Sequence, residues 1–189
     1  CYGVMQNRLK LDFYLKQLLT GKLKDLHPGV RDILHLGLYQ ILETDKIPES
    51  AAVNEAVALA KKYCPRQKFA PGLVNAVLRN AIRSRDTLKA PAGYAERYSH
   101  PQVLVDLLKS YVGKERLEPM LIANNAAPAT VVQINTLRIT AAELMARLEE
   151  EGVSTQPHGW MPDCLILGAT GNLENLPSFK AVSYTHLRA

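Results

Sequence analysis

The sequence predicts a mainly α-helical protein in which a helical bundle is followed by a small α+β unit. Two observations support this prediction. Between Pro28 and Arg85, apolar residues recur at the three- and four-residue spacing of helices that bury one face. After residue 129, β-branched stretches alternate with one strong helix signal, which is typical of a small unit that mixes strands and helices.

The bundle is expected to contain four helices. The first covers residues 5–19, and the other three lie between Pro28 and Arg85, separated by Ile47-Pro48 and by Cys64-Pro65. The last of them begins at Pro71, where proline is well tolerated because the first helical N–H groups have no partner within the helix. Short helices of this kind are marginal alone, so each must bury its apolar stripe against the others.

The second region is predicted to follow Lys89–Gly93, which has the most linker-like composition in the chain. Thr140 and Glu143 form a capping-box signature, with the spacing that marks the start of a helix. The predicted domain ranges are therefore 1–88 for the bundle and 99–180 for the α+β unit. The remaining elements expected in the second range are helices over 101–113 and 114–123 and strands over 130–135, 153–156 and 164–167.

Charge is divided unevenly along the chain. Residues 1–89 carry 15 Lys and Arg against 8 Asp and Glu, whereas residues 90–189 carry 8 against 10. No acidic residue occurs between Ala56 and Arg85. Such a single-sign stretch favours a polyanionic partner, although solvated charges on outer helix faces are the simpler alternative. The residues expected to contact this partner are Lys61, Lys62, Arg66, Lys68, Arg79, Arg83 and Arg85.

Catalytic and metal-binding groupings are scarce in the sequence. The segment Gly168–Gly171 lacks the glycine spacing and the following helix of a phosphate-binding loop. The five histidines and three cysteines show no spacing typical of a zinc or redox site, so neither a metal nor a disulfide is expected. Cys64 could be activated by its basic neighbours, but an inert cysteine at a helix end is the stronger interpretation. No apolar run is long enough to span a membrane, and a cytoplasmic protein is expected.

Several blocks of the sequence resemble one protein family. The runs Ile47–Val57 and Gly72–Arg79 closely resemble the NusB-like N-terminal domain of bacterial 16S rRNA (cytosine-5) methyltransferases of the RsmB/Sun type. Tyr98–Pro101 and Gln133–Thr136 are similar to the segment that joins that domain to the catalytic one. The resemblance covers roughly residues 1–180, so the bundle is expected to be a NusB-like RNA-binding domain.

The resemblance implies an enzyme that transfers a methyl group from S-adenosylmethionine to a cytosine of 16S rRNA. The cofactor loop and the two catalytic cysteines of the family are expected in a domain beyond Phe179, and neither Cys64 nor Cys164 has the matching neighbours. No catalytic residue can therefore be assigned in this chain. The chain alone is expected to be inactive, to bind no cofactor and to be monomeric, with RNA as its partner.

The two ends of the chain are expected to be atypical of the family. The NusB-like domain is interpreted as incomplete at its N-terminus, because the family has helices that would precede Cys1. Residues 181–189 depart from the family pattern and are interpreted as a foreign or artefactual tail that is disordered or poorly packed.

Two further functions stay open from the sequence. A free-standing NusB-type RNA-binding module in transcription antitermination would account for the bundle, but not for residues 99–180. A helical protein-interaction domain would not explain the charge asymmetry. One site residue also has a structural alternative, in which Arg79 pairs with Glu55 and holds the bundle together.

Overall fold

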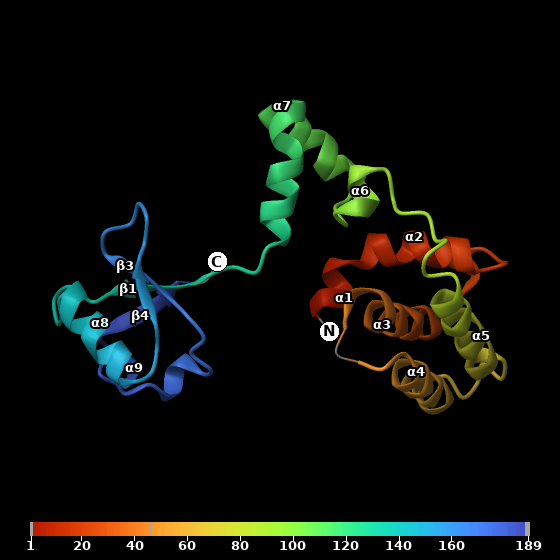
Figure 1. Cartoon of the computed structure of the whole chain (residues 1–189), viewed down its shortest axis with the longest axis horizontal. Coiled ribbons are helices and arrows are strands. Elements are labelled where there is room, and N and C mark those ends of the chain that lie inside the picture. Colours follow the sequence, from red (N-terminus) through yellow and green to blue (C-terminus); the bar gives the residue numbers. More distant parts are fainter. Residues whose placement is uncertain (1, 46, 188–189) are drawn as a thin grey trace. The chain divides into compact units, whose positions relative to one another are not determined.

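The computed structural model of the chain describes residues 2–45 and 47–187, except for the side chain of Leu187. It divides into two compact units, Cys1–Asn125 and Ala126–Ala189 (Figure 1). The regular elements described in the first unit are all helices, and the second contains a four-stranded sheet. The predicted fold class, mainly α with a helical bundle followed by a small α+β unit, is confirmed.

The bundle elements begin and end close to the predicted positions. Helix α3 has Pro28 in its first turn, and His27 caps it by accepting a hydrogen bond from the backbone N–H of Gly29 at 3.2 Å. The single helix expected over 5–19 is two helices that meet at Asn7. The elements are α1 (Tyr2–Gln6), α2 (Arg8–Leu18), η1 (Leu23–Asp25), α3 (Pro28–Glu43), α4 (Glu49–Tyr63) and α5 (Ala70–Arg83).

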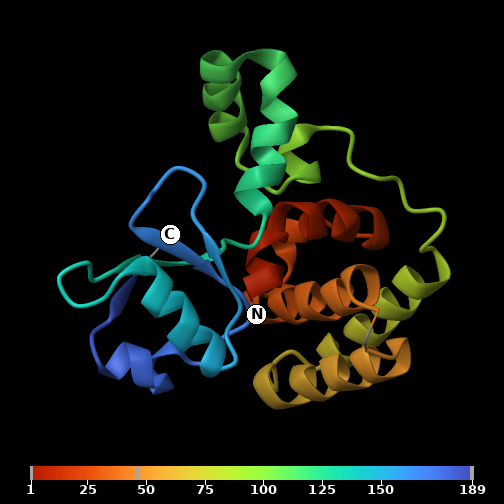
Figure 2. The same ribbon diagram turned by 60° about the vertical axis from the view of Figure 1, so that its left-hand side comes forward.

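Helices α3, α4 and α5 pack side by side and, with α2, enclose the main hydrophobic core (Figure 2). Helix α3 approaches α5 closely at Gly37, where an added Cβ would lie 2.5 Å from Leu78 Cδ1. Leu78 is fully buried, as are Leu34 and Leu38 on the facing helix. The core therefore depends on a residue without a side chain at this crossing.

Two further helices, α6 (Tyr94–Arg97) and α7 (Gln102–Asn125), complete the first unit. Helix α7 is interrupted at Gly113, whose φ of 77° is left-handed, so the predicted stop there is confirmed. Polar side chains join this part to the bundle: Ser99 Oγ accepts from the backbone N–H of Leu9 at 2.9 Å, and Gln6 Nε2 donates to the carbonyl of Asn125 at 2.7 Å.

The second unit is an antiparallel sheet with strand order β2-β3-β1-β4. This is the split β-α-β arrangement, in which β3 lies between the parallel strands β1 and β2. Leu144 and Leu148 of α8 pack in one cluster with Val132 and Leu165 of the sheet, and both predicted capping-box hydrogen bonds are present. The elements are β1 (Thr130–Ile134), α8 (Ala141–Glu150), β2 (Thr155–Pro157), β3 (Cys164–Leu167), η2 (Leu173–Asn175), α9 (Pro177–Lys180) and β4 (Tyr184–Leu187).

The expectation of a disordered or poorly packed tail is wrong for residues 181–187. Strand β4 pairs with β1 along four residues, and Tyr184 is almost fully buried against Phe179. The pairing gives hydrogen-bond partners to backbone N–H and C=O groups along one edge of β1, which would otherwise be unpaired. Residues 188–189 lie outside the described residues. Val182 has a φ of 56°, a left-handed conformation that is unusual for a β-branched residue.

Glu151, the residue that follows the last residue of α8, joins that helix to α9. Both oxygens of Glu151 accept hydrogen bonds from Ser178, one from its backbone N–H at 2.8 Å and one from its hydroxyl at 2.7 Å. Ser178 lies in the first turn of α9, where a carboxylate satisfies N–H groups that have no partner within the helix. Glu151 therefore fixes α9 to the end of α8.

The domain ranges 1–88 and 99–180 stay a prediction, and the structure divides at a different place. In the structure Gln17 donates to the carbonyl of Lys89 and accepts from its N–H, both at 3.0 Å, and Pro91 is buried. Residues 126–129, in contrast, are exposed and in no regular element.

We expect elastase, which cleaves after small residues, to cut within 126–129 before it cuts within 89–93. Mass spectrometry of the first fragments checks this, and first cleavage after Ala92 would support the division predicted from the sequence.

Candidate nucleic-acid interface

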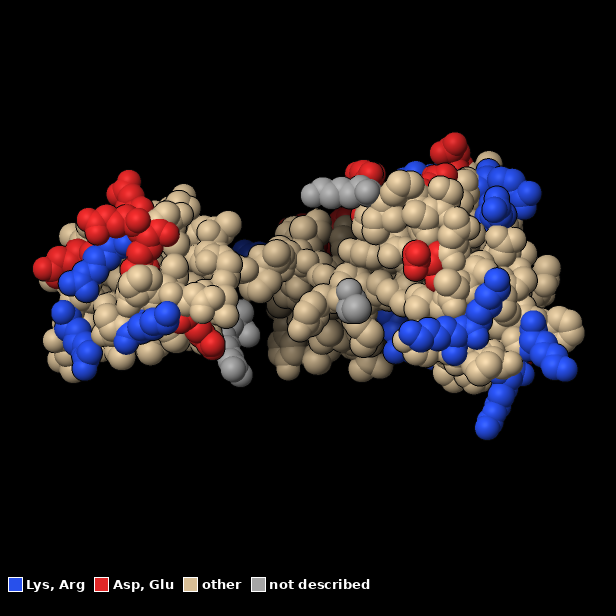
Figure 3. Space-filling model, turned by 90° about the horizontal axis from the view of Figure 1, so that it is seen from below, with Lys and Arg blue, Asp and Glu red and all other residues tan. Residues whose placement is uncertain are grey.

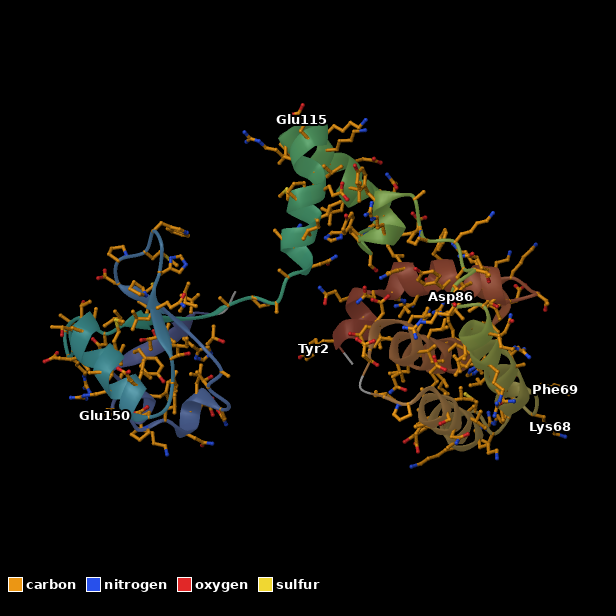
Figure 4. All side chains as sticks on the ribbon, viewed as in Figure 1. Tyr2, Lys68, Phe69, Asp86, Glu115 and Glu150 are labelled. Carbon is orange, nitrogen blue, oxygen red and sulfur yellow. The ribbon has the colours of Figure 1, made fainter. Side chains whose placement is uncertain are left out.

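The end of α4 and the loop that follows it bring four of the predicted site residues to the surface. Helix α4 ends at Tyr63, and Cys64 is buried. Two turns then follow, because the N–H of Gln67 donates to the carbonyl of Cys64 at 2.9 Å and that of Ala70 donates to Gln67 at 2.8 Å. Figure 4 shows Lys68 and Phe69 side by side on this loop, at the outer edge of the bundle. The four residues, all exposed, are Lys61, Lys62, Arg66 and Lys68.

Helix α5 presents two further predicted residues. Its buried stripe includes Val74, Leu78 and Ala81, which leaves Arg79 and Arg83 exposed. These two arginines are four residues apart and therefore lie on the same side of the helix. Arg79 Nε donates to Asn75 Oδ1 at 2.9 Å, one turn earlier, and this bond holds the start of the guanidinium in place.

The structural alternative for Arg79 finds no support in the described residues. Glu55 is exposed, and it forms no ion pair with Arg79 there. Arg85 does have an acidic partner, since its Nη1 lies 3.6 Å from Glu49 Oε1. Both side chains of that pair are about half exposed, so the pair is weak and Arg85 is only partly neutralised.

Six of the seven residues make no ion pair among the described residues, and we call these six, Lys61, Lys62, Arg66, Lys68, Arg79 and Arg83, the basic surface. Figure 3 views the molecule from the side of α4, and lysine and arginine side chains stand out there from a largely uncharged part of the first unit. Unpaired positive charges on adjoining elements raise the local concentration of polyanions. Phosphate groups are the ligands that such a surface suits best, and their contacts carry no sequence information.

Two exposed aromatic residues, one at the end of α4 and one in the loop after it, were not identified from the sequence. Phe69 is 89% exposed and Tyr63 is 63% exposed. Lys62 Nζ lies 5.2 Å from the centroid of the Tyr63 ring, which places a cation over one of its faces. The signal was present in the sequence, since the two aromatics interleave with the basic residues between positions 61 and 69.

A pocket of about 200 Å³ lies beside Phe69. It is formed between the loop after α4 and the segment from η1 to α3. Its polar lining residues are Asp25, His27 and Gln67, and its apolar lining residues include Leu26, Val30, Ala70 and Leu73. Its lining thus combines apolar and polar side chains, but its volume is below the roughly 300 to 1,000 Å³ of pockets that enclose a whole small-molecule ligand.

Other kinds of site are not indicated by the described residues. Cys64 and Cys164 are both free and buried, which agrees with the interpretation of Cys64 as a buried cysteine at a helix end. The described part of the chain holds no group of three or more side chains that could bind a metal ion. Its helices include none that is long and apolar enough to cross a membrane.

Comparison with protein families divides the chain in two. Residues 1–83 match the NusB family, and residues 100–174 match the ferredoxin-like domain of the RsmF/B-like methyltransferases. The second match agrees with the sheet order, because the split β-α-β arrangement is the ferredoxin-like topology.

The chain is also similar to curated proteins named ribosomal RNA small subunit methyltransferase B. It is 37% identical over 183 residues to the protein of Vibrio cholerae, with 95% of this chain and 41% of the relative covered. It is 33% identical to the probable enzyme of Synechocystis and 30% identical to that of Bacillus subtilis, with 41% and 38% of those relatives covered. The chain thus spans about two fifths of the length of these relatives.

A solved structure shares the fold. The crystal structure of PH0851 superposes with a TM-score of 0.71 at 18% identity, covering 98% of this chain and 42% of that chain.

Proposed function

We propose that this chain is the RNA-binding portion of a 16S rRNA (cytosine-5) methyltransferase. Residues 1–83 belong to the NusB family, and residues 100–174 carry the ferredoxin-like domain of the RsmF/B-like methyltransferases. In this proposal the first unit binds ribosomal RNA and positions it for a catalytic domain elsewhere in the parent enzyme. The parent acts in the cytoplasm, and the chain binds as a monomer.

The observation that carries the proposal is the basic surface. Its six cations are exposed and lack acidic partners among the described residues, and they come from adjoining elements, the end of α4, the loop and α5. A helical protein-interaction domain needs no such unbalanced charge. A free-standing NusB-type module needs no ferredoxin-like domain, so the match over residues 100–174 favours the methyltransferase.

The methyl donor of the parent enzyme would be S-adenosylmethionine. The described residues do not fit a role in the transfer step, because both described thiols are buried and a covalent attack on cytosine needs a thiolate that the base can reach. Calorimetry of the chain with S-adenosylmethionine is expected to show no binding, and a micromolar dissociation constant would place at least part of the cofactor site here.

The proposal is tested by the two arginines of α5. If Arg79 and Arg83 contact phosphates, replacing both by glutamine weakens binding to many RNAs alike. It also lowers the slope of log affinity against log salt by about 1.4 to 1.8, because each contact contributes roughly 0.7 to 0.9. Fluorescence anisotropy with a labelled RNA over a range of salt concentrations measures this slope.

A matched variant separates binding from stability in that test. Asn75→Ala removes the acceptor of the Arg79 hydrogen bond but keeps both positive charges. It is expected to leave the salt slope unchanged. If Arg79→Gln lowers the melting temperature by several degrees and does not change the slope, Arg79 is structural and does not belong to the basic surface.

A further inference from the structure

The loop between α4 and α5 combines three features that are needed to hold an unpaired base. It carries cations, an exposed aromatic ring and an adjoining pocket of about 200 Å³ whose lining includes polar side chains. We infer, on the basis of the proposed function, that the first unit prefers single-stranded RNA and stacks one of its bases on Phe69, over this pocket.

Phe69 is the residue whose ring is best placed to stack a base. Its ring is 89% exposed, although a phenylalanine at the surface loses the free energy that burial would provide. Among the described residues it has neither an aromatic nor a cationic partner, whereas Tyr63 has Lys62 over one face of its ring. A ring with a free face is what a base requires for stacking, and every base can stack because each has a π-face.

The surroundings of Phe69 indicate why the partner is RNA. Lys68 precedes it directly, Arg66 lies three residues earlier, and the loop contains no carboxylate to repel phosphates. A protein partner with an apolar anchor would be favoured by an uncharged surrounding, because interface cores are depleted of charged residues. Cations that follow the backbone, together with aromatics that stack the bases, are the typical combination of single-strand binding surfaces.

The pocket provides polar contacts for the edge of a stacked base. Gln67 offers both a donor and an acceptor through its amide, and Asp25, which also lines the pocket, offers a carboxylate acceptor. Duplex RNA keeps its bases stacked and paired, so it offers phosphates to the basic surface but no free base to Phe69. The preference for single strands therefore depends on the aromatic ring, and the general affinity for RNA depends on the charges.

The test measures the affinity of the whole chain for a single-stranded oligonucleotide and for a duplex of the same length. Phe69→Ala is expected to weaken binding of the single strand by about 5- to 150-fold, the range that corresponds to the loss of one stacked base. Binding of the duplex and the salt slope are expected to stay unchanged, because no charge is removed. Phe69→Tyr keeps a ring and is expected to bind the single strand like the unchanged chain.

Trp160→Ala provides the matched control. Trp160 is 80% exposed in the second unit, and no lysine or arginine lies within ten residues on either side of it. Its replacement is expected to change neither affinity. If Phe69→Ala binds the single strand as tightly as the unchanged chain, or weakens the duplex equally, the inference is overturned and the proposed function stands. If the unchanged chain binds no RNA, the proposed function is overturned as well.

Discussion

Replacing Lys61, Lys62, Arg66 and Lys68 together by glutamine is expected to lower the affinity for RNA by about three orders of magnitude at roughly 0.1 M salt. Each phosphate contact releases counterions and contributes about 0.7 to 0.9 to the slope of log affinity against log salt, so four contacts contribute about 2.8 to 3.6. All four side chains are exposed and free of ion pairs among the described residues, so their removal leaves no buried charge behind. The fold is therefore expected to be unchanged, as circular dichroism can verify.

A control with the same change in net charge separates a local surface from general attraction. Four other exposed cations can be replaced by glutamine, and these are Lys109, Lys114 and Arg116 of α7 and Arg147 of α8. The control is expected to lower the affinity only slightly, through weaker long-range attraction. Equal losses in the two variants would show that the net charge of the chain, and not the basic surface, determines binding.

The second large effect concerns the crossing of α3 and α5. Leu78→Ala removes a fully buried side chain and is expected to cost about 2 to 5 kcal/mol of unfolding free energy. Gly37→Ala inserts a methyl group where Leu78 Cδ1 lies 2.5 Å away and is expected to cost about 1 to 3 kcal/mol. In the double variant the new methyl group occupies part of the cavity. The double variant is therefore expected to lose less unfolding free energy than the two single variants lose together. Urea unfolding followed by far-ultraviolet circular dichroism measures all three.

Gly72→Ala is the control for the glycine replacement. Gly72 lies in α5, and a Cβ there would meet no atom within 4 Å. Alanine stabilises a helix relative to glycine by up to about 1 kcal/mol, so this variant is expected to be neutral or more stable. If Gly37→Ala behaves in the same way, the close packing of α3 on α5 does not limit stability.

The bundle could be predicted from the sequence because its signals are local. Proline at the start of α3 and α5 and apolar residues at helical spacing determine where these helices begin and which face they bury. The capping box at Thr140 and the break at Gly113 are equally local and were equally predictable. The resemblance to a family added the NusB-like identity of the bundle, which the helical pattern alone does not specify.

The missed features depend on contacts between residues far apart in the sequence. Ser99 and Leu9 are 90 residues apart, and no local pattern predicts that their hydrogen bond joins α6 and α7 to the bundle. Strand β4 was missed for a related reason, because residues 184–187 form a strand only through pairing with β1. Short strands carry weak sequence signals, and partners across a sheet determine whether they form.

The basic surface shows the same division between local and distant information. Its cations could be identified from the sequence, but the partners that decide which cations stay free could not. Arg85 pairs with Glu49, from the start of the preceding helix, and Arg79 bonds to Asn75, one helical turn away, instead of to Glu55. The pocket beside Phe69 also required the structure, since Asp25 and Gln67 are brought together only by the packing of η1 against the loop.

Ultraviolet cross-linking of the chain to a 16S rRNA fragment, followed by mass spectrometry of the linked peptides, locates the RNA on the protein. The linked peptides are expected to come from residues 61–85, with Phe69 among the linked residues, and excess salt is expected to abolish the links. Links confined to the second unit, residues 126–187, would contradict this expectation.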